Sequence, residues 1–328
     1  MKKSLKIYGE ILRKENRLGK LIDQKAIKDL NEAVLKSMTE CKDNGVAWTP
    51  PFTGKKRGLA YNMFTDHELT GGNQIIALFF GADDRWGTFN AFRKNGMKIR
   101  KGSKGVTFIR PIILKKDEDG KDLEEPKVIG FKDYTMFNGA DVVDIDADKD
   151  ELTQKFENME VSVEDKHRVV QAFVDNTGIK VEHSDLARCY YAQSSDYVHM
   201  TLKSNFTDLN TYYSVLLHEI AHATGHKSRL NRLEKTDSYA FEELVAELTS
   251  MYLSVHFELA HEPTKDNATY LNAWIKGLGD DETFIWKASS EAMKAVKYLM
   301  KLTKKNDWKD KIDRKIETTI EELNSKAA

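Results

Sequence analysis

The segment VLLHEIAHATGHKSRLNR, residues 215–232, places two histidines four residues apart on either side of a glutamate. On an α-helix, His218 and His222 lie one turn apart on the same face, close enough for both imidazoles to bind one metal ion. Glu219 follows the first histidine and can reach a water molecule on that ion. In this HExxH pattern a zinc ion polarises the peptide carbonyl and lowers the pKa of the water, while the glutamate takes the proton. The spacing therefore predicts metal-dependent hydrolysis of peptide bonds.

The alternative is an ordinary amphipathic helix that happens to contain histidines. Apolar residues around the motif would bury the other faces of the helix: Val215, Leu216, Leu217, Ile220 and Ala221. Three ionisable groups would then lie inside a mostly apolar helix. Because buried charge is costly unless it is paired or bound to a metal, we favour the metal site.

A catalytic zinc site needs a third protein ligand and one position open to water. The longer HExxHxxGxxH pattern would place that ligand at Ser228, so this pattern fails, and His226 follows the helix end too closely to turn back. We therefore expect His226 to orient a ligand or to lie in the loop. The next predicted helix carries EELVAE, which leaves three glutamates open as the ligand: Glu242, Glu243 and Glu247.

Two of these glutamates, Glu243 and Glu247, lie on one face of the predicted helix. We expect Glu243 to bind the zinc (Zn2+) and Glu247 to orient a ligand histidine through its free ring nitrogen. For each glutamate taken singly, a solvated helix face is the alternative.

A second feature is the segment RWGTFNAFRKNGMKIRKGSKGVTFIR, residues 85–110, which contains no acidic residue. Its cations are Arg85, Arg93, Lys94, Lys98, Arg100, Lys101, Lys104 and Arg110, and Trp86 and three phenylalanines are interleaved with them. Cations that contact phosphates, together with aromatic rings that stack on exposed bases, predict binding of single-stranded nucleic acid. The alternative is a basic hairpin whose aromatic side chains pack in the core. The segment lacks the GxxxxGK[ST] pattern of a nucleoside-triphosphate site.

Composition limits the classes to which the protein can belong. With 328 residues and 40% hydrophobic residues the chain can form two domains, and a net charge of −1 argues against a wholly cationic nucleic-acid coat protein. Cys41 and Cys189 are its only cysteines, too few for a disulfide framework or a cysteine-based zinc site. No apolar run approaches the roughly 20 residues of a membrane span. The N-terminus is charged and lacks a signal-peptide pattern, so we expect a cytoplasmic protein without a membrane partner.

Patterning along the chain predicts an α+β protein of two domains. Residues 1 to about 45 have helical spacing, whereas alternating stretches such as GVTFIRPIIL up to about residue 145 indicate an antiparallel sheet. The acidic residues 144–160 suggest a linker. We therefore expect a nucleic-acid-binding domain over residues 1–150 and a mainly helical domain over residues 151–328.

Several motifs occur in a fixed order along almost the whole chain. The first half contains WTPPF, GGNQIIALFF, FRKNGMKIRKGSKGV and YTMFNGADV, and the second contains CYYAQSSDYVHM, YYSVLLHEIAHATGHKSRLNR, EELVAEL, YLNAWIKGL and ASSEAMKAVKYL. Together they resemble the ArdC-type antirestriction proteins of plasmids and phages. Those proteins join an N-terminal single-stranded-DNA-binding domain to a zincin-like metallopeptidase domain.

The resemblance implies zinc at His218 and His222, a catalytic base at Glu219, and a glutamate ligand within EELVAE. It also implies DNA binding around residues 98–104, and protection of incoming DNA. Two other functions remain open. The protein could coat single-stranded DNA and carry a non-catalytic, zinc-stabilised domain, or its peptidase could act on a protein substrate bound to DNA.

Overall fold

The computed structural model describes residues 25–48, 58–116, 122–143, 145, 162–235, 238–259 and 267–303. The helices expected before residue 25 lie outside the described residues, as does the expected acidic linker apart from Ile145. The chain forms two compact units, the first made of Met1–Glu157 with Lys265–Glu291 and the second of Asn158–Thr264 with Ala292–Ala328. A late segment thus joins the first unit, and the domain boundary near residue 150 stays a prediction.

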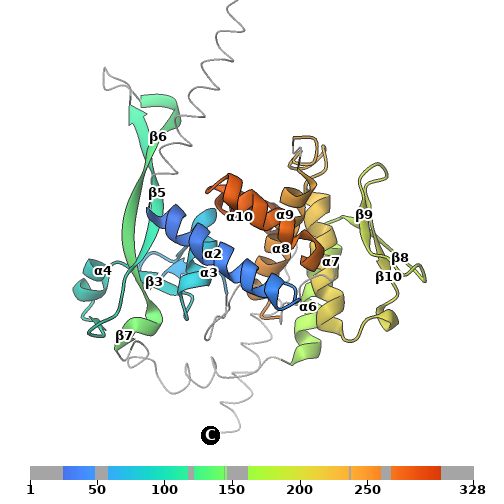
Figure 1. The fold of residues 1–328 in the computed structure, drawn as a ribbon, viewed down its shortest axis with the longest axis horizontal. Helices are drawn as coiled ribbons and strands as arrows, with labels where there is room; N and C mark the ends of the chain where they lie inside the picture. Colours follow the sequence, from blue (N-terminus) through green and yellow to red (C-terminus); the bar gives the residue numbers. More distant parts are fainter. Residues whose placement is uncertain are drawn as a thin grey trace, which may run out of the picture. The chain divides into compact units, whose positions relative to one another are not determined.

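The first unit is built on a five-stranded sheet with the order β2-β1-β3-β6-β5. Neighbouring strands pair antiparallel, as expected, except that β1 runs parallel to β3. β5 and β6 form a long twisted hairpin (Figure 1). The strands are β1 (Tyr61–Asn62), β2 (His67–Glu68), β3 (Arg85–Gly87), β5 (Val106–Lys116) and β6 (Asp122–Asn138). A separate two-stranded sheet pairs β4 (Lys98–Ile99) with β7 (Val142–Val143), which follows the 3-10 helix η1 (Gly139–Asp141).

Helices complete the first unit: α2 (Lys25–Asp43), α3 (Gly72–Phe80), α4 (Phe89–Lys94), α9 (Asn267–Asp280) and the first part of α10 (Phe284–Thr303). In α2 the buried residues recur every three or four positions, and this apolar face packs against α9. Gly72 allows α3 to approach α10, because a Cβ atom at this position would overlap the ring of Trp286.

Two buried polar side chains of α3 join this helix to the strands. The amide of Gln74 accepts a hydrogen bond from the Ala60 N–H at 3.1 Å and donates one to the Ala60 carbonyl at 2.8 Å. Asn73 likewise bonds both backbone groups of Ile109 in β5, at 3.0 and 2.7 Å. Because the buried amides are paired in this way, α3 can be covered on all sides without unsatisfied polar groups at these positions.

The second unit is mainly helical. Its elements are α6 (Val163–Asn176), β8 (Lys180–Ser184), β9 (Tyr190–Ala192), β10 (Tyr197–Thr201), the 3-10 helix η2 (Lys203–Asn205), α7 (Leu209–Thr224), α8 (Tyr239–His256) and the later part of α10. The strand order is β8-β10-β9, with β10 parallel to β8 and antiparallel to β9. α7 packs against α6, α8, β9 and β10, so the helix that carries the HExxH motif lies at the centre of this unit.

These two units confirm the predicted α+β class, with a sheet-containing N-terminal unit and a mainly helical C-terminal unit. Among the described residues, no helix has the length and apolar character that a membrane crossing requires.

Candidate metal centre and nucleic-acid interface

α7 holds the HExxH residues in a rigid, buried frame. The side chain of Asp208 caps the helix by accepting a hydrogen bond from the Thr211 N–H at 2.9 Å, and Gly225 follows the last turn. Apolar residues fill the rest of the helix, so His218 and Glu219 are buried as well. The predicted placement of the two histidines one turn apart on one face is what the structure has.

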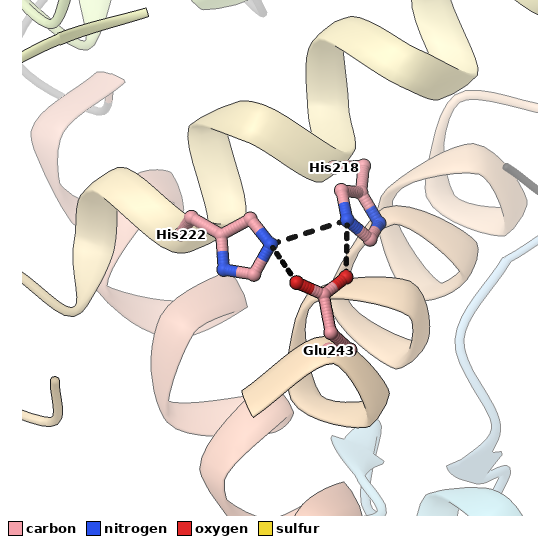
Figure 2. Close-up of side chains that lie close together, drawn as sticks. All are labelled: His218, His222 and Glu243. Carbon is pink, nitrogen blue, oxygen red and sulfur yellow. Dashed lines mark hydrogen bonds and ion pairs between the residues drawn. The ribbon is translucent and has the colours of Figure 1, made fainter. Parts of the chain in front are cut away.

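The structure brings His218, His222 and Glu243 together. Nε2 of His218 lies 3.2 Å from Nε2 of His222. The carboxylate of Glu243 on α8 lies 3.4 Å from Nε2 of His218 and 3.5 Å from Nε2 of His222. Figure 2 shows the three side chains pointing toward one another from the two helices. One ligand atom from each residue lies within 4.8 Å of the others, close enough for a single metal ion to contact all three.

The other ring nitrogens face two further glutamates. Nδ1 of His222 lies 3.2 Å from Oε1 of Glu242 and makes a hydrogen bond to it. Nδ1 of His218 lies 3.2 Å from Oε2 of Glu247, an ion-pair distance without the alignment of a hydrogen bond. Carboxylates at both Nδ1 atoms favour the Nδ1–H tautomer, which leaves the two Nε2 lone pairs facing the Glu243 carboxylate. This donor set is electron-rich and fits a cation.

The histidines and glutamates of this site shift one another's pKa values. Burial by itself would lower the pKa of His218, but Glu243 and Glu247 outweigh it and raise this pKa to about 10. For His222 burial again lowers the pKa, and Glu242 and Glu243 raise it to about 9. The two imidazoles in turn hold the pKa of Glu243 well below its ordinary value, against the effect of its burial. Positive charge is therefore stabilised between these side chains, whether a proton or a metal ion supplies it.

Glu242 is held in place by Arg232, a residue that our sequence reasoning missed. The guanidinium donates from Nε to Oε2 and from Nη2 to Oε1 of Glu242, both at 2.7 Å, and this pair is buried. Arg232 lies in the loop after α7 and belongs to the SRLNR portion of the motif. The only sequence signal was a basic residue in a polar loop, which carries no spacing rule.

Glu219 lies next to the first histidine with 8% of its surface exposed. Within the described part of the chain, its carboxylate makes no hydrogen bond or ion pair. It is therefore free to accept a proton from a water molecule near the two histidines. Burial raises the pKa of the Cys189 thiol, and the charge of Glu219 raises it further.

His226 lies in the loop, as one of our two expectations had it. Its Nδ1 lies 2.7 Å from the Ser228 hydroxyl and 3.6 Å from a carboxylate oxygen of Asp196. Its contacts therefore fix the loop after α7.

The predicted nucleic-acid interface, residues 85–110, runs from β3 through α4 and β4 to the first part of β5. Seven of the eight cations in this segment are exposed. Six of them lie on α4, on β4 or in the loop after β4: Arg93, Lys94, Lys98, Arg100, Lys101 and Lys104. The seventh, Arg110, lies on β5. No carboxylate of the described residues forms an ion pair with any of them. The six cations form a surface of positive charge, which we call the basic surface.

Two predicted members of this interface must be corrected. Trp86 is fully buried and packs edge-on against Phe108 with ring centroids 4.9 Å apart, so it cannot stack on a base. Arg85 donates to both carboxylate oxygens of Asp83, at 2.9 and 2.6 Å, and this pairing occupies its guanidinium. The exposed ring of the segment is Phe89, which begins α4 and lies 6.1 Å from the ring of Phe137.

Family models match both parts of the chain. A model of the N-terminal domain of anti-restriction factor ArdC matches residues 25–137, and a model of zincin-like metallopeptidases matches residues 168–291. The second match includes residues 265–291, although these residues cluster with the first compact unit. The boundary between the family models therefore differs from the boundary between the compact units.

Curated relatives are similar over most of this chain. Two Escherichia coli proteins, each described as DNA primase TraC, are 28% and 29% identical over 305 and 304 residues, or 85% of this chain. The matched region is only 28% and 20% of their own lengths, so the chain spans less than a third of these relatives. The protein y4eC of Sinorhizobium fredii is 29% identical over 224 residues, which is 65% of this chain and 70% of y4eC.

Two solved structures share the fold. The metal-free crystal structure of antirestriction ArdC from plasmid R388 is 26% identical, with a TM-score of 0.66, over 86% of this chain and 99% of the R388 chain. The Mn(II)-bound structure of the same protein is 27% identical, with a TM-score of 0.62, over 84% of this chain and 97% of the other. Both parts of the chain are thus found together, in the same order, in one known protein.

Proposed function

This chain is an ArdC-type antirestriction protein, and from that premise we propose that it binds incoming single-stranded DNA through the basic surface and hydrolyses peptide bonds at a metal site. The observation that supports peptidase activity is the convergence of His218, His222 and Glu243, next in the chain to Glu219, whose carboxylate makes no hydrogen bond or ion pair among the described residues. The DNA-binding proposal is supported by six exposed cations that form no ion pair with a carboxylate of the described residues, and by the exposed ring of Phe89 in the same segment. Peptidase activity and DNA binding depend on different residues, so each is tested by its own experiment.

For the metal we propose Zn2+. Two imidazoles and one carboxylate make up the donor set of many catalytic zinc sites, in which a fourth position stays open. The similar R388 protein has a Mn(II)-bound structure, and sites made of imidazoles and a carboxylate accept several divalent ions. A zinc ion held by these residues would act as a Lewis acid and lower the pKa of nearby water.

The chain's own residues supply the remaining requirements of hydrolysis. Glu219 takes a proton from the attacking water, since its carboxylate is buried near the histidines and makes no competing contact among the described residues. Glu242 orients the imidazole of His222 through a hydrogen bond to its Nδ1, and Glu247 faces Nδ1 of His218 at 3.2 Å. Because these side chains are fixed before substrate arrives, little reorganisation is needed at the moment of reaction.

Proteolysis is tested with Zn2+-loaded protein and a protein substrate bound to DNA, with and without added single-stranded DNA. We expect cleavage by the wild-type protein and none by the Glu219→Gln variant. Cleavage only of DNA-bound protein would identify the enzyme as a protease of DNA-bound proteins. Failure of the wild type to cleave any substrate would leave a DNA-coating protein with a non-catalytic metal domain.

Single-stranded DNA fits the basic surface better than a duplex. Cations that are not paired with carboxylates can neutralise phosphates of any sequence, and the Phe89 ring offers a stacking partner that only an unpaired base can use. Its neighbours Arg93 and Lys94 lie on the same short helix. This helix could therefore contact both the DNA phosphates and one base within a few nucleotides of a single strand.

Fluorescence anisotropy with labelled oligonucleotides tests this half of the proposal. Affinity for single strands should exceed affinity for the matching duplex and fall steeply as salt is raised. Absent binding, equal affinity for the duplex, or binding that is insensitive to salt would show the DNA proposal to be wrong, and the peptidase proposal would be unaffected.

A further inference from the structure

We propose that Arg232 is a positioning residue for metal binding, because it fixes Glu242 and Glu242 fixes the imidazole of His222. The inference rests on the proposed metal site. In this role a residue of the loop after α7, which makes no hydrogen bond to His218, His222 or Glu243 in the described structure, sets the affinity and geometry of that site.

Hydrogen bonds occupy most of the N–H donors of the Arg232 guanidinium. Besides the two bonds to Glu242, Nη1 donates to the Thr224 hydroxyl at 3.1 Å and Nη2 donates to the Ala221 carbonyl at 3.1 Å. Its side chain is 5% exposed, so these bonds form away from water. Two of its partners belong to the last turn of α7, the helix of His222, and the third belongs to α8.

Glu242 connects Arg232 to the metal ligand. Its Oε1 accepts from Nη2 of Arg232 and also from Nδ1 of His222, so one oxygen atom joins the two side chains. A carboxylate fixed on both oxygens by a planar guanidinium has little rotational freedom. The direction of the His222 lone pair on Nε2 is therefore set by a residue ten positions further along the chain. Carboxylates that orient ligand histidines in this way strengthen metal binding.

The backbone after α7 is built to bring Arg232 back to its helix. The N–H groups of Arg232 and Leu233 both donate to the Gly225 carbonyl, at 2.9 and 3.0 Å. A Cβ atom at Gly225 would lie 2.8 Å from Cγ of Leu233 and 3.1 Å from Nη2 of Arg232. The glycine thus leaves the space that the returning loop occupies.

Stability alone is a weak explanation for this pair. Buried ion pairs are often no more stabilising than apolar residues of similar volume, because both charges lose their hydration. The directional link from Arg232 through Glu242 to His222 is what an apolar pair could not supply. A positioning role therefore predicts an effect on metal binding that exceeds any effect on folding.

The same loop offers a matched control in Arg229. This arginine also forms a close pair with a carboxylate, Asp196, and donates to the Ala223 carbonyl at 2.6 Å and to the Tyr191 hydroxyl at 3.3 Å. Its side chain is 13% exposed. Among the described residues, none of its hydrogen-bond or ion-pair partners is a candidate metal ligand or a carboxylate that contacts one. Replacing it removes the same charge and a similar pair from the same loop.

The test compares Arg232→Met with Arg229→Met in the full chain. The Kd for Zn2+ is measured by competition with a chromophoric chelator, and the visible absorption of Co2+-loaded protein reports the coordination geometry. Urea unfolding of the metal-free proteins measures stability. We expect Arg232→Met to raise the Kd roughly 10- to 100-fold and to change the Co2+ spectrum. Arg229→Met should change neither.

Lysine variants keep the comparison usable if a methionine variant does not fold. Lysine retains the charge but lacks the planar fork, so Arg232→Lys should raise the Kd by less than Arg232→Met, and Arg229→Lys should leave it unchanged. Equal metal binding by the Arg232 variants and wild type, or equal losses in the Arg232 and Arg229 variants, would overturn the positioning role. If the wild type itself bound no Zn2+ or Co2+, the proposed metal site would fail and this inference with it.

Discussion

Trp86 and Phe89 lie three residues apart in the basic segment, yet Trp86 is 0% exposed and Phe89 is 52% exposed. If Phe89 stacks on a base, replacing it with alanine removes a contact that is worth about 1–3 kcal/mol in other single-strand binders. We expect Phe89→Ala to weaken binding of single-stranded DNA by roughly tenfold, with little change in stability. Fluorescence anisotropy and urea unfolding measure the two effects.

Trp86→Ala provides the contrasting variant. Removal of a fully buried tryptophan should cost about 3–5 kcal/mol in the free energy of unfolding. Single-strand binding per folded molecule should stay close to that of the wild type. If Phe89→Ala bound DNA as tightly as wild type, the stacking interpretation would be wrong and the basic surface would act through charge alone.

The basic surface also predicts a change in salt dependence. Replacing Lys98, Arg100 and Lys101 with alanine removes up to three phosphate contacts, so the slope of log affinity against log salt should fall by about 2 for a single strand. Arg100 also donates to the Ala140 carbonyl at 3.0 Å, so part of its guanidinium is already engaged within the protein.

Three exposed lysines on α2 form a control of equal charge: Lys28, Lys36 and Lys42. Their replacement by alanine should leave the slope near the wild-type value. Equal slopes for the two triple variants would show that the basic surface does not contact the DNA phosphates.

Glu219→Gln separates the enzymatic from the coating function. The amide keeps the shape of the side chain but cannot take a proton, so Zn2+ content and DNA affinity should remain and proteolysis should be lost. In an assay of protection of incoming DNA from restriction, we expect this variant to fail. The exposed Glu234 on the following loop offers a control, and Glu234→Gln should protect like wild type. Full protection by Glu219→Gln would instead favour a protein that acts by coating DNA.

The ion pair between Asp83 and Arg85 predicts how the stability of the first unit depends on pH. Burial raises the pKa of Asp83, but the hydrogen bonds from Arg85 outweigh it and hold this pKa below the ordinary 3.8. Because the folded state favours the ionised form, the contribution is present above about pH 3.8 and is lost as the pH falls through the lowered value. Urea-unfolding midpoints measured from pH 6 down to pH 3 should therefore decline more steeply for wild type than for Asp83→Asn. Arg85→Met should flatten the decline in the same way, and an unchanged decline in both variants would argue against this pair as its source.

Much of the candidate metal site could be predicted from the sequence because its geometry is local. The spacing of His218 and His222 fixes them on one helical face, and the same rule applies to Glu243 and Glu247. The arrangement between helices was harder to foresee. Which glutamate faces the histidines depends on how α7 and α8 pack, and Glu242 could be placed at His222 only once that packing was known.

Other features had no local signal. Arg232 reaches Glu242 because the loop doubles back at Gly225, and no spacing pattern records such a return. The burial of Trp86 depends on its packing against Phe108 in β5, so an aromatic residue among cations was wrongly assigned to the surface. The parallel pairing of β1 with β3, and the grouping of Lys265–Glu291 with the first unit, are likewise set by contacts between distant segments.

Zinc content after removal and reloading of the metal tests the central claim most directly. Protein stripped with a chelator and dialysed against Zn2+ is assayed by mass spectrometry of the metal, with wild type beside His222→Ala, Glu243→Ala and the control Glu234→Gln. We predict one zinc ion per chain in wild type and the control, and almost none in the other two variants. Zinc retained in full by both His222→Ala and Glu243→Ala, or absent from wild type, would contradict a site formed by His218, His222 and Glu243.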